Sequence, residues 1–224
     1  GADVVVLAVP VGAMAGILTE LGRLSFDGIV TDAGSTKGNV VAAARTALGT
    51  RFPHFIPGHP IAGTEQSGVE ASQANLFRGR RVILTPASET NAQALGQVRA
   101  LWEATGAEVS EISAEEHDHI LAASSHLPHM LAYLLMDLLV RRDDHRTVFA
   151  ASAGGLRDVT RIAASDPVMW RDVCLTNREA LLTVLAQYRD ELGTLMVAIE
   201  RGDAKWLEDT FTRAKRARDA LNGK

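Results

Sequence analysis

The sequence has little of what marks secreted, membrane or nucleic-acid-binding proteins. Its single cysteine, Cys174, excludes an internal disulfide framework and is typical of a reducing compartment, so we expect a cytoplasmic protein. The apolar opening segment, residues 4–11, is far too short to span a bilayer, so no membrane partner is expected. The net charge of −4 comes without a basic stripe, which argues against nucleic acid as a partner.

A Gly-x-Gly-x-x-Gly segment is also missing. In doubly wound dinucleotide-binding folds this segment occupies the first βα turn, and an acidic residue that binds the ribose follows about 20 residues later. The sequence begins instead on a strand-like run, residues 3–10, and has no initiator methionine. We therefore expect the N-terminal part of the dinucleotide-binding domain to lie upstream of Gly1.

Strand and helix patterns alternate over the first half of the chain. Continuous apolar runs, which are typical of strands buried on both faces of a parallel sheet, alternate with segments of helical spacing. Strands are expected at 3–10, 29–32, 55–57, 81–85 and 107–112, and helices at 11–24, 37–48 and 90–105. This alternation predicts an α/β fold with a parallel sheet.

The pattern changes at Ser113, where Ser-Ala-Glu-Glu forms a capping box. From there we expect only helices, at 117–140 with an adjustment near Pro128, at 172–201, and at 203–221 after the helix-ending Gly202. Another helical run begins at Asp166-Pro167. The predicted organisation is a partial Rossmann-like domain over residues 1–112, the remainder of a dinucleotide-binding domain, and an all-α domain over residues 113–224.

Polar motifs are spaced along this otherwise apolar frame. Histidine, serine, acid and arginine come from separate elements, as an enzyme active site requires. The motifs are Asp-Ala-Gly-Ser-Thr-Lys at 32–37, Gly-His-Pro-Ile-Ala-Gly-Thr-Glu at 58–65, His-Asp at 117–118, Ser-His-Leu-Pro-His at 125–129, Gly-Gly-Leu-Arg-Asp-Val-Thr-Arg at 154–161, and Asp-Pro-Val-Met-Trp-Arg-Asp at 166–172.

This ordered series resembles the prephenate/arogenate (cyclohexadienyl) dehydrogenase family of tyrosine biosynthesis, over essentially the whole chain. The resemblance implies oxidative decarboxylation of prephenate or arogenate with hydride transfer to NAD, or NADP. The expected helix 117–140 is apolar over much of its circumference through Leu134, Leu135, Leu138, Leu139 and Val140, which predicts a homodimer built from the helical domain. The sequence does not decide whether the substrate is prephenate or arogenate, or whether the cofactor is NAD or NADP. Feedback inhibition by tyrosine also stays open.

His59 and Ser35 are the expected catalytic residues. A neutral imidazole accepts a hydroxyl proton near working pH, and we expect Pro60 and the flanking glycines to hold His59 in an irregular turn. A histidine that merely caps a loop is the alternative. The Ser35 hydroxyl can bond both His59 and the substrate hydroxyl, or serve as a helix N-cap.

Arg161 resembles the family's substrate-carboxylate anchor, since a guanidinium binds a carboxylate through two parallel hydrogen bonds. The other residues expected on the substrate side are Thr64, Glu65, His129, Gly155, Asp158 and Trp170. On the cofactor side we expect Pro10, Asp32, Gly34 and Ser35. No metal is expected, because no carboxylate or thiolate set completes the pair His126 and His129.

Two other readings remain open. Other β-hydroxyacid-type dehydrogenases use a lysine in the helical domain, but the four lysines here, Lys37, Lys205, Lys215 and Lys224, include no promising candidate. The second alternative is a non-catalytic truncated fragment that retains the helical dimerisation domain. Without the glycine-rich loop, we expect the chain as it stands to bind dinucleotide poorly and to turn over little.

Overall fold

The computed structural model describes residues 2–24, 26–63 and 68–221. Its contacts divide the chain into two compact units, one up to Leu181 and one from Leu182 onward. The first unit holds the strands and all helices up to α8 Pro167–Thr176, and the second holds most of α9 Arg178–Arg201 together with α10 Ala204–Leu221. The predicted domain boundary near residue 112 therefore stays a prediction.

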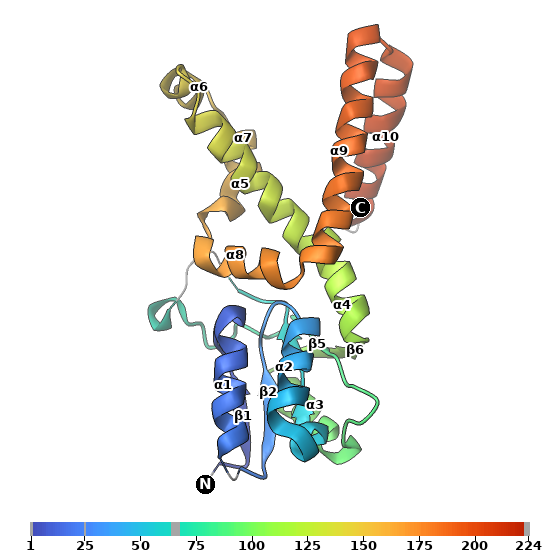
Figure 1. Cartoon of the computed structure of the whole chain (residues 1–224). Helices are drawn as coiled ribbons and strands as arrows, with labels where there is room; N and C mark the ends of the chain where they lie inside the picture. Colours follow the sequence, from blue (N-terminus) through green and yellow to red (C-terminus); the bar gives the residue numbers. More distant parts are fainter. Residues whose placement is uncertain (1, 25, 64–67, 222–224) are drawn as a thin grey trace. The chain divides into compact units, whose positions relative to one another are not determined.

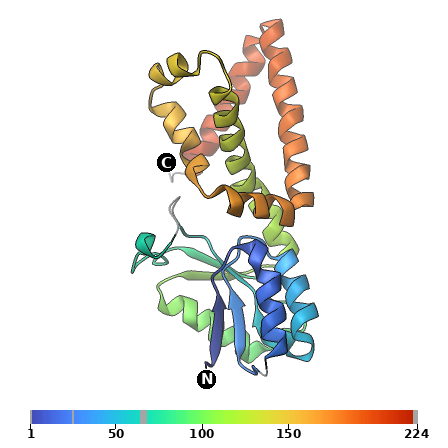
Figure 2. The ribbon, with the colours of Figure 1, turned by 60° about the vertical axis from the view of Figure 1, so that its left-hand side comes forward.

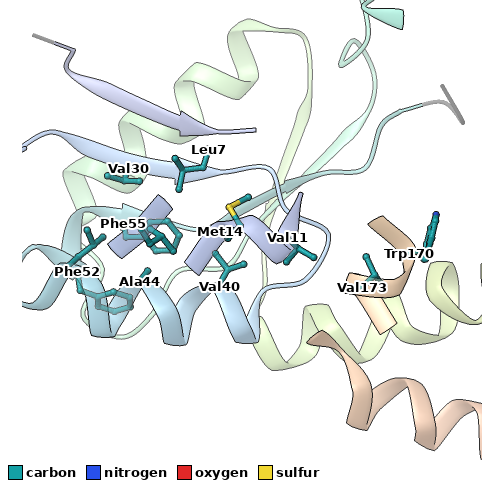
Figure 3. Packing of buried hydrophobic residues seen from close by; sticks show 12 residues of the cluster. Leu7, Val11, Met14, Val30, Val40, Ala44, Phe52, Phe55, Trp170 and Val173 are labelled. Carbon is teal, nitrogen blue, oxygen red and sulfur yellow. The ribbon is translucent and has the colours of Figure 1, made fainter. Parts of the chain in front are cut away.

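Three strands near the N-terminus form a parallel sheet in the order β1 Val4–Leu7, β2 Ile29–Asp32 and β3 Phe55–Ile56. Helices α1 Val11–Arg23 and α2 Gly38–Leu48 lie side by side against these strands (Figure 1; Figure 2). Their apolar faces, spaced three and four residues apart, meet the buried strand residues in one core (Figure 3). The predicted βαβ arrangement of this part is confirmed.

A second sheet contains β4 Gly58–Pro60, β5 Arg81–Leu84 and β6 Glu108–Glu111, and α3 Ala92–Ala104 packs on it. β6 runs parallel to β5, but β4 runs antiparallel to it, with His59 opposite Ile83. The expectation of an irregular turn around His59 was therefore wrong. Pro57 has no N–H group to continue the hydrogen bonds of β3. The chain therefore leaves the first sheet after β3, and the next residues pair with β5 as β4.

The rest of the first unit is helical. Ser113 accepts a hydrogen bond from the Glu116 N–H at 3.1 Å, and Asp166 accepts one from the Met169 N–H at 2.7 Å, so both predicted helix starts are confirmed. The elements are α4 Ala114–Leu121, a π-helical turn Ala122–His126, α5 Leu127–Val140, α6 His145–Ala150, α7 Gly154–Thr160, a 3-10 helix Arg161–Ala164 and α8.

Two of the predicted long helices are interrupted. The expected adjustment of the helix 117–140 near Pro128 takes the form of the π-helical turn, which ends just before that proline. The expected helix 172–201 is broken at Asn177, which leaves the helical region with φ −110° and ψ 36°. The sequence pattern also missed α6 and α7. Gly202, with φ +64°, ends α9 as predicted, and α10 follows it.

Within the described part of the chain, no helix is both long and apolar enough to cross a membrane.

Candidate active site

A buried ion pair lies at the carboxyl end of β2. The Asp32 and Lys37 side chains are completely buried and bonded to each other. Asp32 also accepts hydrogen bonds from the Gly34 N–H at 2.8 Å and the Gly58 N–H at 3.1 Å, and the Lys37 ammonium donates to the Gly58 carbonyl at 2.6 Å. Burial lowers the pKa of Lys37, and Asp32 opposes that shift. The pair thus joins the 32–37 turn to the strand that carries His59.

His59 is half-buried on β4, and its neighbour is the completely buried His117 on α4. The Nδ1 atom of His59 lies 2.8 Å from Nε2 of His117, and Nδ1 of His117 lies 2.8 Å from Oδ1 of Asp118. Burial holds the pKa of His59 well below its usual value, and the charge of the nearby Lys37 ammonium lowers it further. His59 is therefore neutral near pH 7 and able to accept a proton.

Asp118 connects α4 to the start of α2. Its two carboxylate oxygens accept hydrogen bonds from the backbone N–H groups of Lys37 and Gly38, each at 2.8 Å. Burial alone would raise the pKa of Asp118, but the bonds from His117, Gly38 and Lys37 outweigh it and lower the pKa. The ionised carboxylate therefore occupies the positive end of the α2 dipole.

His126 is the last residue of the π-helical turn. It is buried against the β2–α2 turn, residues 32–37. Its Nδ1 accepts from the Asn177 amide at 3.1 Å, and the same amide donates to the Asp118 carbonyl at 2.7 Å. A further hydrogen bond joins His126 to the Ser35 backbone. Burial lowers the pKa of His126 to about 4, so this ring is neutral. Ser35 itself is half-buried in the β2–α2 turn.

His129 and Trp170 form an aromatic wall close to His126. Their rings stack with centroids 3.7 Å apart and planes 21° apart, and His126 meets the face of Trp170 edge-on at 5.9 Å. The Nδ1 atom of His129 bonds to the Ser125 carbonyl at 2.8 Å. Among the described residues, the buried indole Nε1 of Trp170 has no hydrogen-bond partner, although tryptophan N–H groups usually find one when buried.

The remaining predicted residues lie apart from this cluster or outside the described residues. Gly155 and Asp158 are exposed on α7, and Arg161 is exposed at the start of the 3-10 helix that follows. Pro10 is exposed directly before α1. Thr64 and Glu65 fall outside the described residues. The structure thus brings together Ser35, His59, His129 and Trp170. Gly155, Asp158 and Arg161 lie on α7 and the 3-10 helix that follows it.

Asp32 and Gly34, two residues predicted on the cofactor side, are engaged in internal contacts. Asp32 is fully buried, and its oxygens are engaged by three internal donors. A Cβ atom on Gly34 would lie 2.9 Å from Oδ2 of Asp32, so the glycine is required by internal packing. Both residues shape the turn that presents Ser35.

Three site residues were missed or left without a firm role by the sequence reading: Lys37, His117 and Asn177. A lysine directly after a buried strand and a His-Asp pair at the start of a helix were visible signals for the first two. Asn177 gave no signal, because its place in an apolar helical pattern resembled an ordinary helical position. In the described part of the chain, no group of three His, Cys, Asp or Glu is placed to hold a metal ion.

Two models of known protein domains together match most of the chain. Residues 1–111 match the model of the prephenate dehydrogenase nucleotide-binding domain, and residues 113–213 match that of the prephenate dehydrogenase dimerization domain. Cyclohexadienyl dehydrogenase of Zymomonas mobilis is 40% identical over 223 residues, which cover 98% of this chain and 75% of that protein. Prephenate dehydrogenase of Bacillus subtilis is 38% identical over a match that covers 98% of this chain and 60% of the Bacillus protein.

Solved structures agree. Prephenate dehydrogenase from A. aeolicus, in complex with hydroxyphenyl propionate and NAD+, has a TM-score of 0.91 at 38% identity, covering 98% of this chain and 76% of that one. Arogenate dehydrogenase from Synechocystis has a TM-score of 0.83 at 27% identity, covering 98% of this chain and 79% of that one. From the domain matches, the sequence identities and these structures, the chain belongs to the prephenate dehydrogenase family.

Proposed function

We propose that the protein catalyses the oxidative decarboxylation of prephenate or arogenate with NAD, or NADP, as hydride acceptor, in tyrosine biosynthesis. The observation that carries this proposal is His59, a neutral and half-buried histidine with one ring nitrogen bonded to His117. It lies on β4, which is tied to the Ser35 turn through Asp32 and Lys37. The names of the relatives, including the arogenate and cyclohexadienyl enzymes, support this substrate class.

The reaction needs one proton acceptor near the ring hydroxyl. As hydride leaves C4 of the cyclohexadiene ring for the nicotinamide, His59 takes the hydroxyl proton and C4 becomes a carbonyl carbon. The ring carboxylate then departs as CO2, and its bonding electron pair makes the ring aromatic and returns to the oxygen, which takes the proton back. Because the proton is returned, His59 is regenerated in each turnover.

The carboxyl ends of β1 and β2 are suited to the dinucleotide. Pro10 and Ser35 follow these two parallel strands, and doubly wound sheets bind dinucleotides outside the carboxyl ends of their strands. NAD, when bound, supplies the hydride acceptor. Ser35 is available to contact it, whereas Asp32 and Gly34 hold the turn from inside.

The substrate side is assigned to the aromatic wall and to the α7 region. Trp170 and His129 offer a flat face for the ring, and Arg161 a guanidinium for a carboxylate. Gly155, Asp158, Thr64 and Glu65 complete the proposed set. The protein's main task is to hold two rings in register, since aromatisation itself provides driving force.

The test is His59→Asn in the intact protein, assayed by NADH formation with prephenate and with arogenate. Losing a general base should lower kcat by roughly 10²–10⁴, with much smaller changes in substrate KM. His54→Asn, an exposed histidine of the same unit, is the matched control and should retain wild-type kcat. Near-normal kcat in His59→Asn would remove His59 as the base.

A further inference from the structure

The hydrogen bonds around His59 allow its protons to be assigned. An ionised carboxylate only accepts hydrogen bonds, so Asp118 requires the proton of His117 to be on Nδ1. With its proton on Nδ1, His117 presents the lone pair of Nε2 to His59, and this lone pair requires the proton of His59 to be on Nδ1. The second nitrogen of His59, Nε2, is left with its lone pair.

We propose that His117, oriented by Asp118, is a positioning residue that sets the tautomer of His59 and makes Nε2 its proton-accepting atom. This inference rests on the proposed function, in which His59 removes the substrate's hydroxyl proton. Without His117, the neutral ring of His59 is free to carry its proton on either nitrogen, and one of these two forms cannot act as a base through Nε2.

The same chain of bonds stabilises the charged form of His59. When Nε2 takes a proton, the ring becomes a cation whose Nδ1–H still donates to His117. His117 in turn donates to Asp118, whose negative charge is fixed by the α2 backbone N–H groups. Among the described residues, the other groups that act on the charge of His59 are Lys37, which is bonded to Asp32, and His126, which is neutral. Asp118 is therefore the carboxylate connected to the base through the His117 ring.

His126 shows that the neighbouring histidine is held in the opposite tautomer. Its Nδ1 accepts from Asn177, so the proton of its neutral ring is on Nε2. His126 and His59 thus carry their protons on opposite nitrogens. The Nδ1 atom of His126 contacts the donor amide of Asn177, whereas the Nδ1 atom of His59 contacts the acceptor ring of His117. This difference argues that partner chemistry, rather than burial alone, decides each tautomer.

The experiment combines histidine-labelled NMR of the substrate-free protein with steady-state kinetics. The chain has seven histidines, and the His59 resonance is identified by its loss in His59→Asn. Wild-type His59 should give the ¹⁵N and ¹³C shifts of the Nδ1–H tautomer. His117→Leu, which removes the acceptor, should abolish that single tautomer and lower kcat on the order of 10–100-fold.

His117→Gln is the conservative variant, because its side-chain oxygen still accepts from Nδ1–H of His59. It should keep the Nδ1–H tautomer and most of the wild-type kcat, a rescue that a purely space-filling role of His117 would not produce. The proposal is overturned if wild-type His59 carries its proton on Nε2, or if His117→Leu retains both the tautomer and kcat. Wild-type turnover of prephenate or arogenate tests the proposed function separately, since the tautomer is measured without substrate.

Discussion

Lys37 is the residue on which the geometry of the site most depends. Its ammonium group is completely buried and bonds both Asp32 and the Gly58 carbonyl, one residue before His59. A buried ion pair is not in itself strong evidence for stability, because both charges lose their hydration. Its position between the Ser35 turn and β4 instead indicates that it keeps Ser35 and His59, the two proposed catalytic residues, in register.

Lys37→Met tests this role. The substitution keeps the aliphatic volume but leaves the Asp32 carboxylate buried without its cation, so we expect the free energy of unfolding to fall by about 3–5 kcal/mol. Urea unfolding at pH 7 measures it. The double variant Lys37→Met with Asp32→Asn should recover part of the loss, because it removes the unpaired charge. Lys205→Met, at an exposed Lys205–Asp209 pair, is the control and should leave the unfolding midpoint nearly unchanged.

At the level of elements, helix interruptions bring the site together. The π-helical turn Ala122–His126 and the break at Asn177 both occur inside apolar segments of helical spacing. His126 ends the π-helical turn, and Asn177 is the residue at the second break. The Asn177 amide donates a hydrogen bond to His126, so the two interruptions bring these side chains together. Interruptions of this kind are frequent at functional sites.

Asn177→Leu tests the importance of the break between α8 and α9. Leucine suits the apolar helical pattern, but it removes the donors to His126 and to the Asp118 carbonyl. Leaving these buried acceptors unpaired should lower the free energy of unfolding by about 1–3 kcal/mol. Gln97→Leu, which replaces an exposed amide on α3, is the matched control for thermal unfolding. Equal melting temperatures for the two variants would contradict the assigned role of Asn177.

The same elements show where prediction from sequence succeeds and where it stops. Strand–helix alternation and the caps at Ser113 and Asp166 were readable, because they depend on residues a few positions apart. The antiparallel pairing of β4 and the break at Asn177 depend on partners far along the chain, and no local pattern encodes them.

The site divides in the same way. His59 and Ser35 were predicted from compact motifs. The bond between Asp118 and the α2 backbone joins residues about 80 positions apart, and the buried state of Lys37 follows from packing rather than from its neighbours in sequence. The roles of these groups therefore needed the structure.

At the scale of the whole molecule, apolar side chains remain uncovered in each unit of the single chain. On α5, Leu134 and Leu138 are 60% and 57% exposed, and on α9, Met196 and Ile199 are 64% and 61% exposed. Residues 113–213 match a dimerization domain. Large exposed apolar surfaces mark interaction sites, and a closed two-fold dimer is the most common way to cover them. We therefore expect a homodimer built from the helices.

Sedimentation velocity at micromolar concentration tests the dimer with the double variant Leu134→Glu and Leu138→Glu. Two carboxylates on the uncovered face of α5 would have to be buried without partners in the dimer, so the variant should sediment as a folded monomer. Leu101→Glu, at an exposed leucine on α3, introduces the same chemistry outside the helical region and should remain dimeric. A wild-type monomer would refute the prediction, and a dimeric double variant would show that α5 lies outside the interface.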